Sequence, residues 1–146
     1  MRVAAVTLLL CALFFGVSAQ PEFQKTFQRQ LIEISNDSVL LLPEGTFHLE
    51  GSLWLDGKKN VVIRGAGESR TILDFAGQIS GAEGLKITSS SNITVEDLTV
   101  QNTKGDGIKA QLVDGLTLRN VRAEWTNGPD KKNGGYGLHP VQGTYV

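Results

Sequence analysis

Cysteine is almost absent from this chain of 146 residues, because Cys11 is its single example. One cysteine excludes an internal disulfide and a zinc site built on thiolates. Excess charge is absent as well: 14 Lys and Arg face 15 Asp and Glu, which excludes the broad basic field of a nucleic-acid-binding protein. Proline is scarce (4 residues), whereas 17 glycines indicate many tight turns. A hydrophobic content of 40% argues for one folded domain rather than a disordered chain.

The longest apolar run is short and lies at the N-terminus. Residues 3–17 are nearly all apolar, and they follow the charge of Arg2 and precede the small residues Ser18 and Ala19. A membrane-spanning helix needs about 20 such residues, so the pattern predicts a signal peptide over residues 1–19. An uncleaved anchor is the alternative. We therefore expect an exported protein, periplasmic or extracellular, with no membrane span and no cysteine after cleavage.

An internal repeat of about 23 residues organises the rest of the chain. Residues 81–103 align without gaps with residues 104–126, and identical residues meet at Gly84/Gly107 and Lys86/Lys109. Apolar residues meet at five further positions: Leu85/Ile108, Ile93/Leu116, Val95/Leu118, Leu98/Val121 and Val100/Ala123. Each block holds three short segments of period 2, which predicts a solenoid coil with a buried axis. The alternative, an antiparallel sandwich, would have longer strands and would not require equal spacing.

The segment before the first coil has helical spacing. Phe23, Phe27, Leu31 and Ile34 would share one face of a helix. The first coil of a solenoid exposes its interior and unpaired strand backbone, so we expect residues 20–36 to cap it. The solenoid domain would then span residues 37–146. Residues Asn60, Asn92 and Gly115 each precede a strand, which predicts a corner with a left-handed backbone.

Three stretches carry a family resemblance: LPEGTFHLEGSLWLDGKKNVVIRGAGESRTILDF, NITVEDLTVQNT and NGGYGLHPVQ. They are similar to right-handed parallel β-helix repeat proteins of the pectin-lyase-like superfamily, over residues 43–142. The resemblance implies an all-β, right-handed parallel β-helix of roughly four coils with an N-terminal capping helix. It implies an exported bacterial protein without an assigned activity, with a second exported protein as a partner.

The C-terminal part departs from that family, whose members are longer. The chain stops at Val146, one or two strands into a coil, and residues 134–146 show no helical cap pattern. A bare solenoid end exposes backbone groups and apolar side chains. We therefore expect further coils beyond residue 146, and pairing of this end with another molecule is the alternative.

Stacked coils place equivalent residues about 4.8 Å apart, so the repeat predicts ladders of outward side chains. Lys86, Lys109 and His139 form one ladder, and Glu83, Asp106 and Tyr136 would lie beside it. The simplest interpretation is a solvated basic stripe. The functional alternative is an anion site for a uronic-acid polymer, with Asp106, Lys109 or His139 as the catalytic candidates, because proton abstraction beside a carboxylate needs a base and a cation.

An insertion, residues 127–133, follows Trp125 and precedes Tyr136. Insertions in repeat proteins often lie on the binding face, and aromatic rings can stack on sugars. Lys86, Lys109, Trp125 and Tyr136 are therefore the candidates for substrate binding. The alternative is a solvated loop with Trp125 packed at its base.

Motifs for other chemistry are incomplete. Gly65 and Gly67 lack the third glycine of a dinucleotide loop, and His48 and His139 are too isolated for a metal pair. We therefore expect no cofactor and no metal. The sequence favours an exported binding or scaffold module for carbohydrate. A polysaccharide lyase or epimerase acting on uronic acids is the alternative, and whether the protein is an enzyme stays open.

Overall fold

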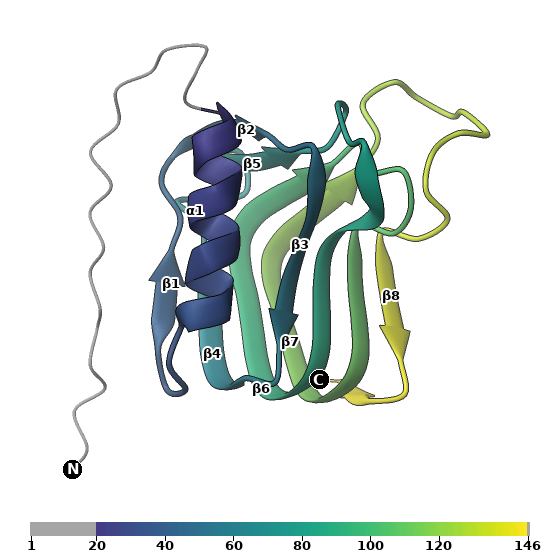
Figure 1. Cartoon of the computed structure of the whole chain (residues 1–146). Coiled ribbons are helices and arrows are strands. Elements are labelled where there is room, and N and C mark those ends of the chain that lie inside the picture. Colours follow the sequence, from purple (N-terminus) through teal and green to yellow (C-terminus); the bar gives the residue numbers. More distant parts are fainter. Residues whose placement is uncertain (1–19, 146) are drawn as a thin grey trace.

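The computed structural model describes residues 20–145, so the predicted signal peptide lies outside the described residues. One helix, α1 (Gln20–Glu33), precedes nine strands (Figure 1). Their bounds are β1 (Val39–Leu41), β2 (Gly45–His48), β3 (Gly51–Asp56), β4 (Lys59–Arg64), β5 (Thr71–Asp74), β6 (Ser80–Gln101), β7 (Ile108–Glu124), β8 (Leu138–Val141) and β9 (Thr144–Tyr145). All strand pairs are parallel. The chain forms a β-solenoid of about 4 turns, which confirms the predicted parallel β-helix.

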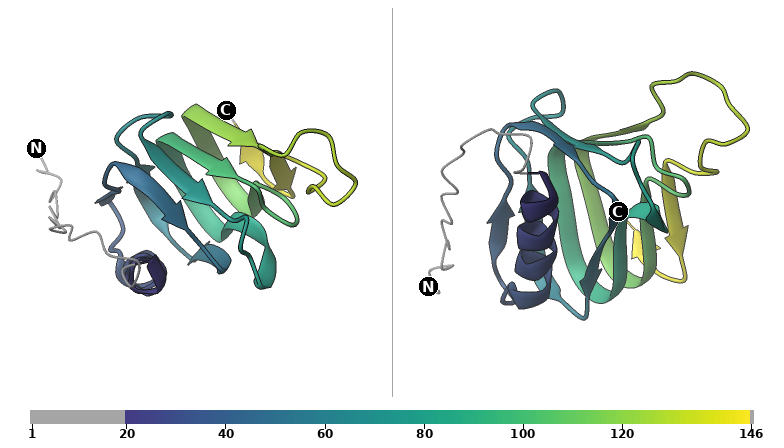
Figure 2. Two further views of the ribbon diagram at one scale, coloured as in Figure 1. Left: turned by 90° about the horizontal axis from the view of Figure 1, so that it is seen from above. Right: turned by 45° about the horizontal axis from the view of Figure 1, so that its top comes forward.

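The register divides the solenoid into three faces, whose stacked layers are visible from above in Figure 2. The first face holds β1, β4 and residues 93–96 and 116–119. The second face holds β2, β5 and residues 98–101 and 121–124. The third face holds β3, residues 85–88 and 108–111, and β8. Each circuit of the chain therefore adds one strand to every face.

The predicted register between neighbouring coils is confirmed. Leu85 pairs with Ile108, and Ile93 pairs with Leu116, inside the buried core. The spacing of 23 residues holds from Glu96 to Arg119, but it is 32 residues from Arg64 to Glu96. The longer coil carries the loops after β4 and β5. The predicted repeat length is therefore that of a coil without long loops. Coils with loops at their corners are longer.

The predicted left-handed corner is present. Asn60, Asn92 and Gly115 have φ values of 55°, 51° and 79°, and Asp37 opens the same column at 60°. The side-chain amide of Asn92 donates to Asn60 Oδ1 (2.8 Å), and that of Asn60 donates to Asp37 Oδ1 (2.6 Å). Pairing between coils continues around such corners. As a result β6 and β7 are unbroken strands of 22 and 17 residues, not the separate short strands that the repeat predicts.

The core is a column of apolar side chains inside the coils. Inward side chains stack from coil to coil, as in the row formed by Val61, Ile93 and Leu116. Phe47 and Phe75 are among its largest side chains and are at most 2% exposed. Burial of these side chains is the main stabilising term, because the described residues contain no disulfide.

Helix α1 occupies the position that a strand would take before β3 in the third face (Figure 1). Two glutamines there bind backbone groups in β3 and just before it. Gln24 Oε1 accepts from the N–H of Glu50 (2.7 Å), and the Gln28 amide bonds both the N–H (2.9 Å) and the C=O (3.0 Å) of Trp54. A glutamine amide offers a donor and an acceptor, as a peptide group does. The helix therefore covers the start of the third face, within the segment 20–36 that was predicted to cap.

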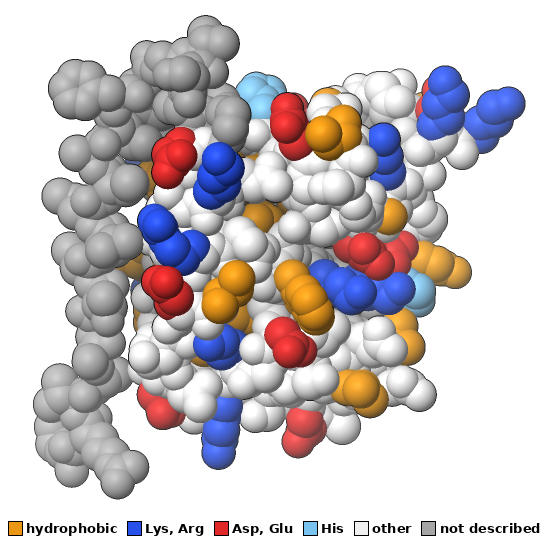
Figure 3. Space-filling view, viewed as in Figure 1, with side chains coloured by type: hydrophobic (Ala, Val, Ile, Leu, Met, Phe, Trp, Pro, Cys, Tyr) orange, Lys and Arg blue, Asp and Glu red, His pale blue; other side chains and the backbone are white. Residues whose placement is uncertain are grey.

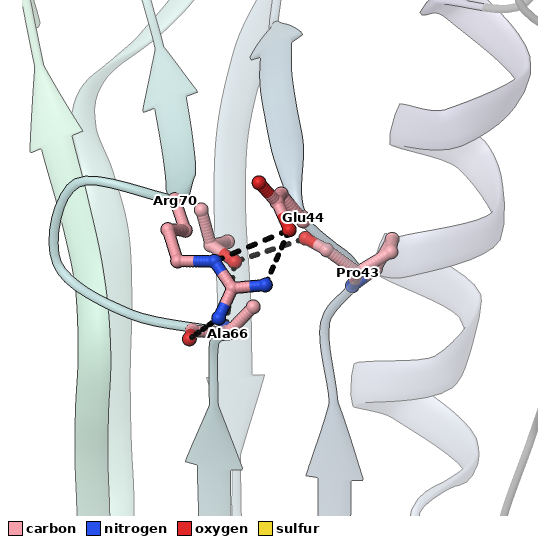
Figure 4. A network of polar contacts seen from close by, with 5 residues as sticks. Pro43, Glu44, Ala66 and Arg70 are labelled. Carbon is pink, nitrogen blue, oxygen red and sulfur yellow. Dashed lines mark hydrogen bonds and ion pairs between the residues drawn. The ribbon is translucent and has the colours of Figure 1, made fainter.

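Polar contacts tie the loop after β4 to the preceding coil (Figure 4). The guanidinium of Arg70 donates to Glu44 Oε2 (2.5 Å and 3.2 Å), and the Thr71 hydroxyl donates to the Pro43 carbonyl (2.9 Å). The hydrogen bond and then the charge of Arg70 lower the pKa of Glu44. An exposed pair contributes little to stability, so its role is to position the loop.

Candidate functional site

The outer side of the third face carries a ladder of four side chains. Register pairs Trp54 with Lys86, Lys86 with Lys109, and Lys109 with His139. The last two steps are the predicted ladder. We call these four residues the third-face ladder.

Glu83, Asp106 and Tyr136 stack beside it, as predicted. Hydrogen bonds to the carbonyls of Asp106 and Tyr136 join successive coils at this point, donated by Gly84 and Gly107. These three residues form the flanking ladder, and both ladders together make the third-face site. Figure 3, which looks onto this face, shows acidic and basic side chains gathered next to a histidine.

The two ladders are joined by one ion pair and one histidine–carboxylate contact. Lys109 Nζ lies 3.6 Å from Glu83 Oε1, and His139 Nδ1 lies 2.6 Å from Asp106 Oδ2. The Tyr136 ring lies over the His139 ring, with centroids 4.6 Å apart. Lys109 and His139 thus each have a carboxylate neighbour, so the predicted basic stripe carries acidic groups beside it.

Trp54 is a site residue that the repeat did not reveal. The residue is 50% exposed, and Lys86 Nζ lies 5.9 Å from the ring centroid, within the range of a cation–π contact. The indole N–H donates to Thr88 Oγ1 (2.7 Å), whose hydroxyl donates to Asp56 Oδ1 (2.5 Å). This chain of hydrogen bonds fixes the ring. Trp54 precedes its ladder partner by the longer coil spacing, so an alignment on the predicted repeat length misses it.

The surroundings of Glu83 shift the pKa of its carboxyl group. Burial acts to raise its pKa, but its own backbone N–H, the charges of Lys86 and Lys109, and the backbone of Ala82 outweigh burial, so the pKa is lowered. A lowered pKa means that the ionised form stabilises the folded state. This stabilisation is present above the unfolded-state pKa and is lost as pH falls through the folded-state pKa.

Glu83→Gln should therefore lower the free energy of unfolding by about 1 kcal/mol at neutral pH, at the upper end for a partly exposed ion pair. The difference from the unsubstituted protein should shrink as pH falls below 4.5, the ordinary pKa of this carboxyl, and vanish in stronger acid. Urea unfolding at a series of pH values measures this difference. A difference that grows in acid would contradict the assigned ion pairs.

Trp125 lies in a different part of the molecule. Its indole N–H donates to the Thr103 carbonyl (2.7 Å), at the corner before the third face. With Lys104, Lys132 and other loop residues it lines an open hollow of about 290 Å³. Tyr136, in contrast, lies over His139. The two aromatic candidates that flank the insertion therefore have different neighbours.

The first face holds a further charged cluster. Glu96 is only 4% exposed, and its carboxylate accepts from Arg64 Nε (2.5 Å) and from Arg119 (3.3 Å). The repeat of 23 residues relates Glu96 to Arg119, but it shows neither the second arginine nor the burial. Since both acceptor oxygens are engaged, this cluster holds three coils in register.

No group of three or more His, Cys, Asp or Glu that could hold a metal occurs within residues 20–145. In the same range no helix is long and apolar enough to cross a membrane. Comparison with known protein families, with curated proteins and with solved structures found no match to this chain.

Proposed function

We propose that the protein is a carbohydrate-binding module whose third-face site holds an extended glycan along the solenoid axis. The alignment of Trp54, Lys86, Lys109 and His139 on successive coils carries this proposal. The steps between coils are about 4.8 Å, comparable to the length of one sugar unit in an extended chain. A linear polymer can therefore meet a similar set of groups at each step.

Exposed rings support the proposal at both ends of the site. Trp54 begins the ladder, and Tyr136, which is 58% exposed, lies over the last residue of the ladder. Aromatic rings offer a flat apolar surface together with a polar group, which suits the faces and hydroxyls of sugars. Ammonium and carboxylate groups between the rings can donate to and accept from those hydroxyls.

Trp54→Ala tests this function directly. On a panel of immobilised glycans we expect the unsubstituted protein to bind at least one glycan. The variant should bind it about tenfold or more weakly, because truncating this tryptophan removes a large contact surface. Leu41→Ala, an exposed apolar change on the first face, is the matched control and should bind normally. Absence of binding to every glycan, or full binding by Trp54→Ala, would contradict the proposal.

One contact favours a second function, a lyase or epimerase acting on a uronic-acid polymer. A carboxylate at Nδ1 orients a histidine as a base, and Asp106 stands 2.6 Å from Nδ1 of His139. Lys109 is the adjacent cation of the ladder. Incubation with polygalacturonate and alginate would reveal a lyase through the absorbance of unsaturated ends, and His139→Ala should abolish that signal. No absorbance change with either polymer would contradict the lyase.

We further propose that this binding occurs outside the cytoplasm. The signal-peptide pattern of residues 1–19 supports export, and the resemblance to pectin-lyase-like β-helix proteins supports the same compartment. Detection of the mature protein in the periplasmic or culture fraction, with its N-terminus at Gln20, tests this part.

A further inference from the structure

We infer that Glu83 and Asp106 set the ligand class of the third-face site, and that the site selects neutral glycans over acidic ones. This inference rests on the proposed glycan binding. In this inference Glu83 and Asp106 determine specificity, because their negative charges compensate the positive charges of the ladder. It also opposes the second function, which needs an acidic polymer at the same place.

The charges of the site support this inference. Lys86 and Lys109 face three carboxylates on the same face, those of Asp56, Glu83 and Asp106. With His139 neutral the sum is negative, and with His139 protonated it is zero. A polymer with a carboxylate on every sugar would therefore meet no net positive charge. Electrostatic complementarity, which gives charged partners their specificity, is missing for such a ligand.

The burial of the pairs makes the compensation effective. The side chains of Lys109 and Glu83 are 25% and 19% exposed, and those of His139 and Asp106 are 34% and 14% exposed. Charges that are partly removed from water are screened less by salt than those on an open surface. The Glu83 and Asp106 carboxylates thus act on a bound ligand at short range, as do the cations beside them.

The same groups suit a neutral sugar. A sugar hydroxyl both donates and accepts hydrogen bonds, and the two ladders alternate ammonium or imidazole donors with carboxylate acceptors. Lys86 approaches the Trp54 ring, so its charge is directed partly to an aromatic face. A neutral glycan can therefore use every polar group of the site without leaving a carboxylate opposite a carboxylate.

The double variant Glu83→Gln/Asp106→Asn tests the inference. The amides keep the shape of the side chains but free Lys109 and His139 from their partners. By isothermal titration calorimetry we expect the unsubstituted protein to bind a neutral hexasaccharide, cellohexaose, at least about tenfold more tightly than hexagalacturonate. In the variant, affinity for hexagalacturonate should rise about tenfold, and this gain should decline with added salt.

The control variant Glu44→Gln/Asp130→Asn makes the same change in charge away from the site. Glu44 lies in the turn before β2, and Asp130 lies in the loop 127–133. This control should leave both affinities unchanged, which separates a local effect from the overall charge of the protein. If the double variant does not fold, the single variant Asp106→Asn replaces it. Its affinity for hexagalacturonate should rise by a smaller factor.

Three results would overturn the inference. They are tight binding of hexagalacturonate by the unsubstituted protein, an unchanged preference in the folded variants, or an equal gain in the control variant. Binding of cellohexaose and hexagalacturonate with equal affinity, sensitive to Trp54→Ala, would overturn the selectivity while leaving the glycan-binding function intact. Absence of binding to any glycan on the panel would overturn both.

Discussion

Gly65→Ala should lower the free energy of unfolding by about 3 kcal/mol, because it forces an added carbon into a packed backbone. A Cβ at Gly65 would lie 2.1 Å from the carbonyl oxygen of Asp97 on the next coil and 2.9 Å from Cβ of Thr71. Neither atom is the end of a flexible side chain, so the coils themselves must separate. Urea unfolding followed by circular dichroism measures the loss, which corresponds to a fall of about 10 °C in Tm.

Gly77→Ala is the matched control for this substitution. No atom lies within 4 Å of a Cβ built at Gly77, and its φ is outside the left-handed region. Its stability should stay within about 0.5 kcal/mol of the unsubstituted protein. Equal effects at Gly65 and Gly77 would show that the close approach of successive coils at Gly65 is wrong.

Ile93→Ala should cost about 2–5 kcal/mol, because it empties a position in the middle of the core. Ile93 is fully buried and lies in register between Val61 and Leu116. In a solenoid each coil is stabilised chiefly by its neighbours, so a gap at this level weakens contacts on both sides. The loss is measured by urea unfolding, with the free energy extrapolated to zero denaturant.

Ile79→Ala removes the same atoms from a side chain that is 78% exposed. We expect a change within about 0.5 kcal/mol, as for most surface substitutions. A small effect at Ile93, comparable to that at Ile79, would contradict the stacked core. Together the two variants separate burial from any general effect of replacing isoleucine.

The stacking of coils could be predicted from the sequence because it depends on short-range patterns. Apolar residues at period 2 define the inward face of each strand, and the offset of one repeat brings Leu85 over Ile108. The left-handed corner at Asn60 and Asn92 was equally accessible, since asparagine tolerates that backbone better than most residues. Both features depend only on residues within one or two coils of each other, so the sequence pattern is enough to predict them.

The chemistry of the candidate site was predicted less completely. The ladder of Lys86, Lys109 and His139 follows from the repeat, but Trp54 does not, because loops lengthen the preceding coil. Nor does the sequence show that the cations are compensated. Side chains in neighbouring ladders meet diagonally, and whether Lys109 reaches Glu83 depends on rotamers and on the twist of the face.

The glutamine contacts of α1 also bear on how the protein behaves at high concentration. An open parallel strand can template the addition of another chain and so begin a filament. Along β3 that template is partly occupied, since Gln28 holds the N–H and C=O of Trp54, and Gln24 holds the N–H of Glu50 just before the strand. The neighbouring starts of the other two faces are strands of only three and four residues, which offer little length for templating. The first coil thereby resists becoming a seed for aggregation.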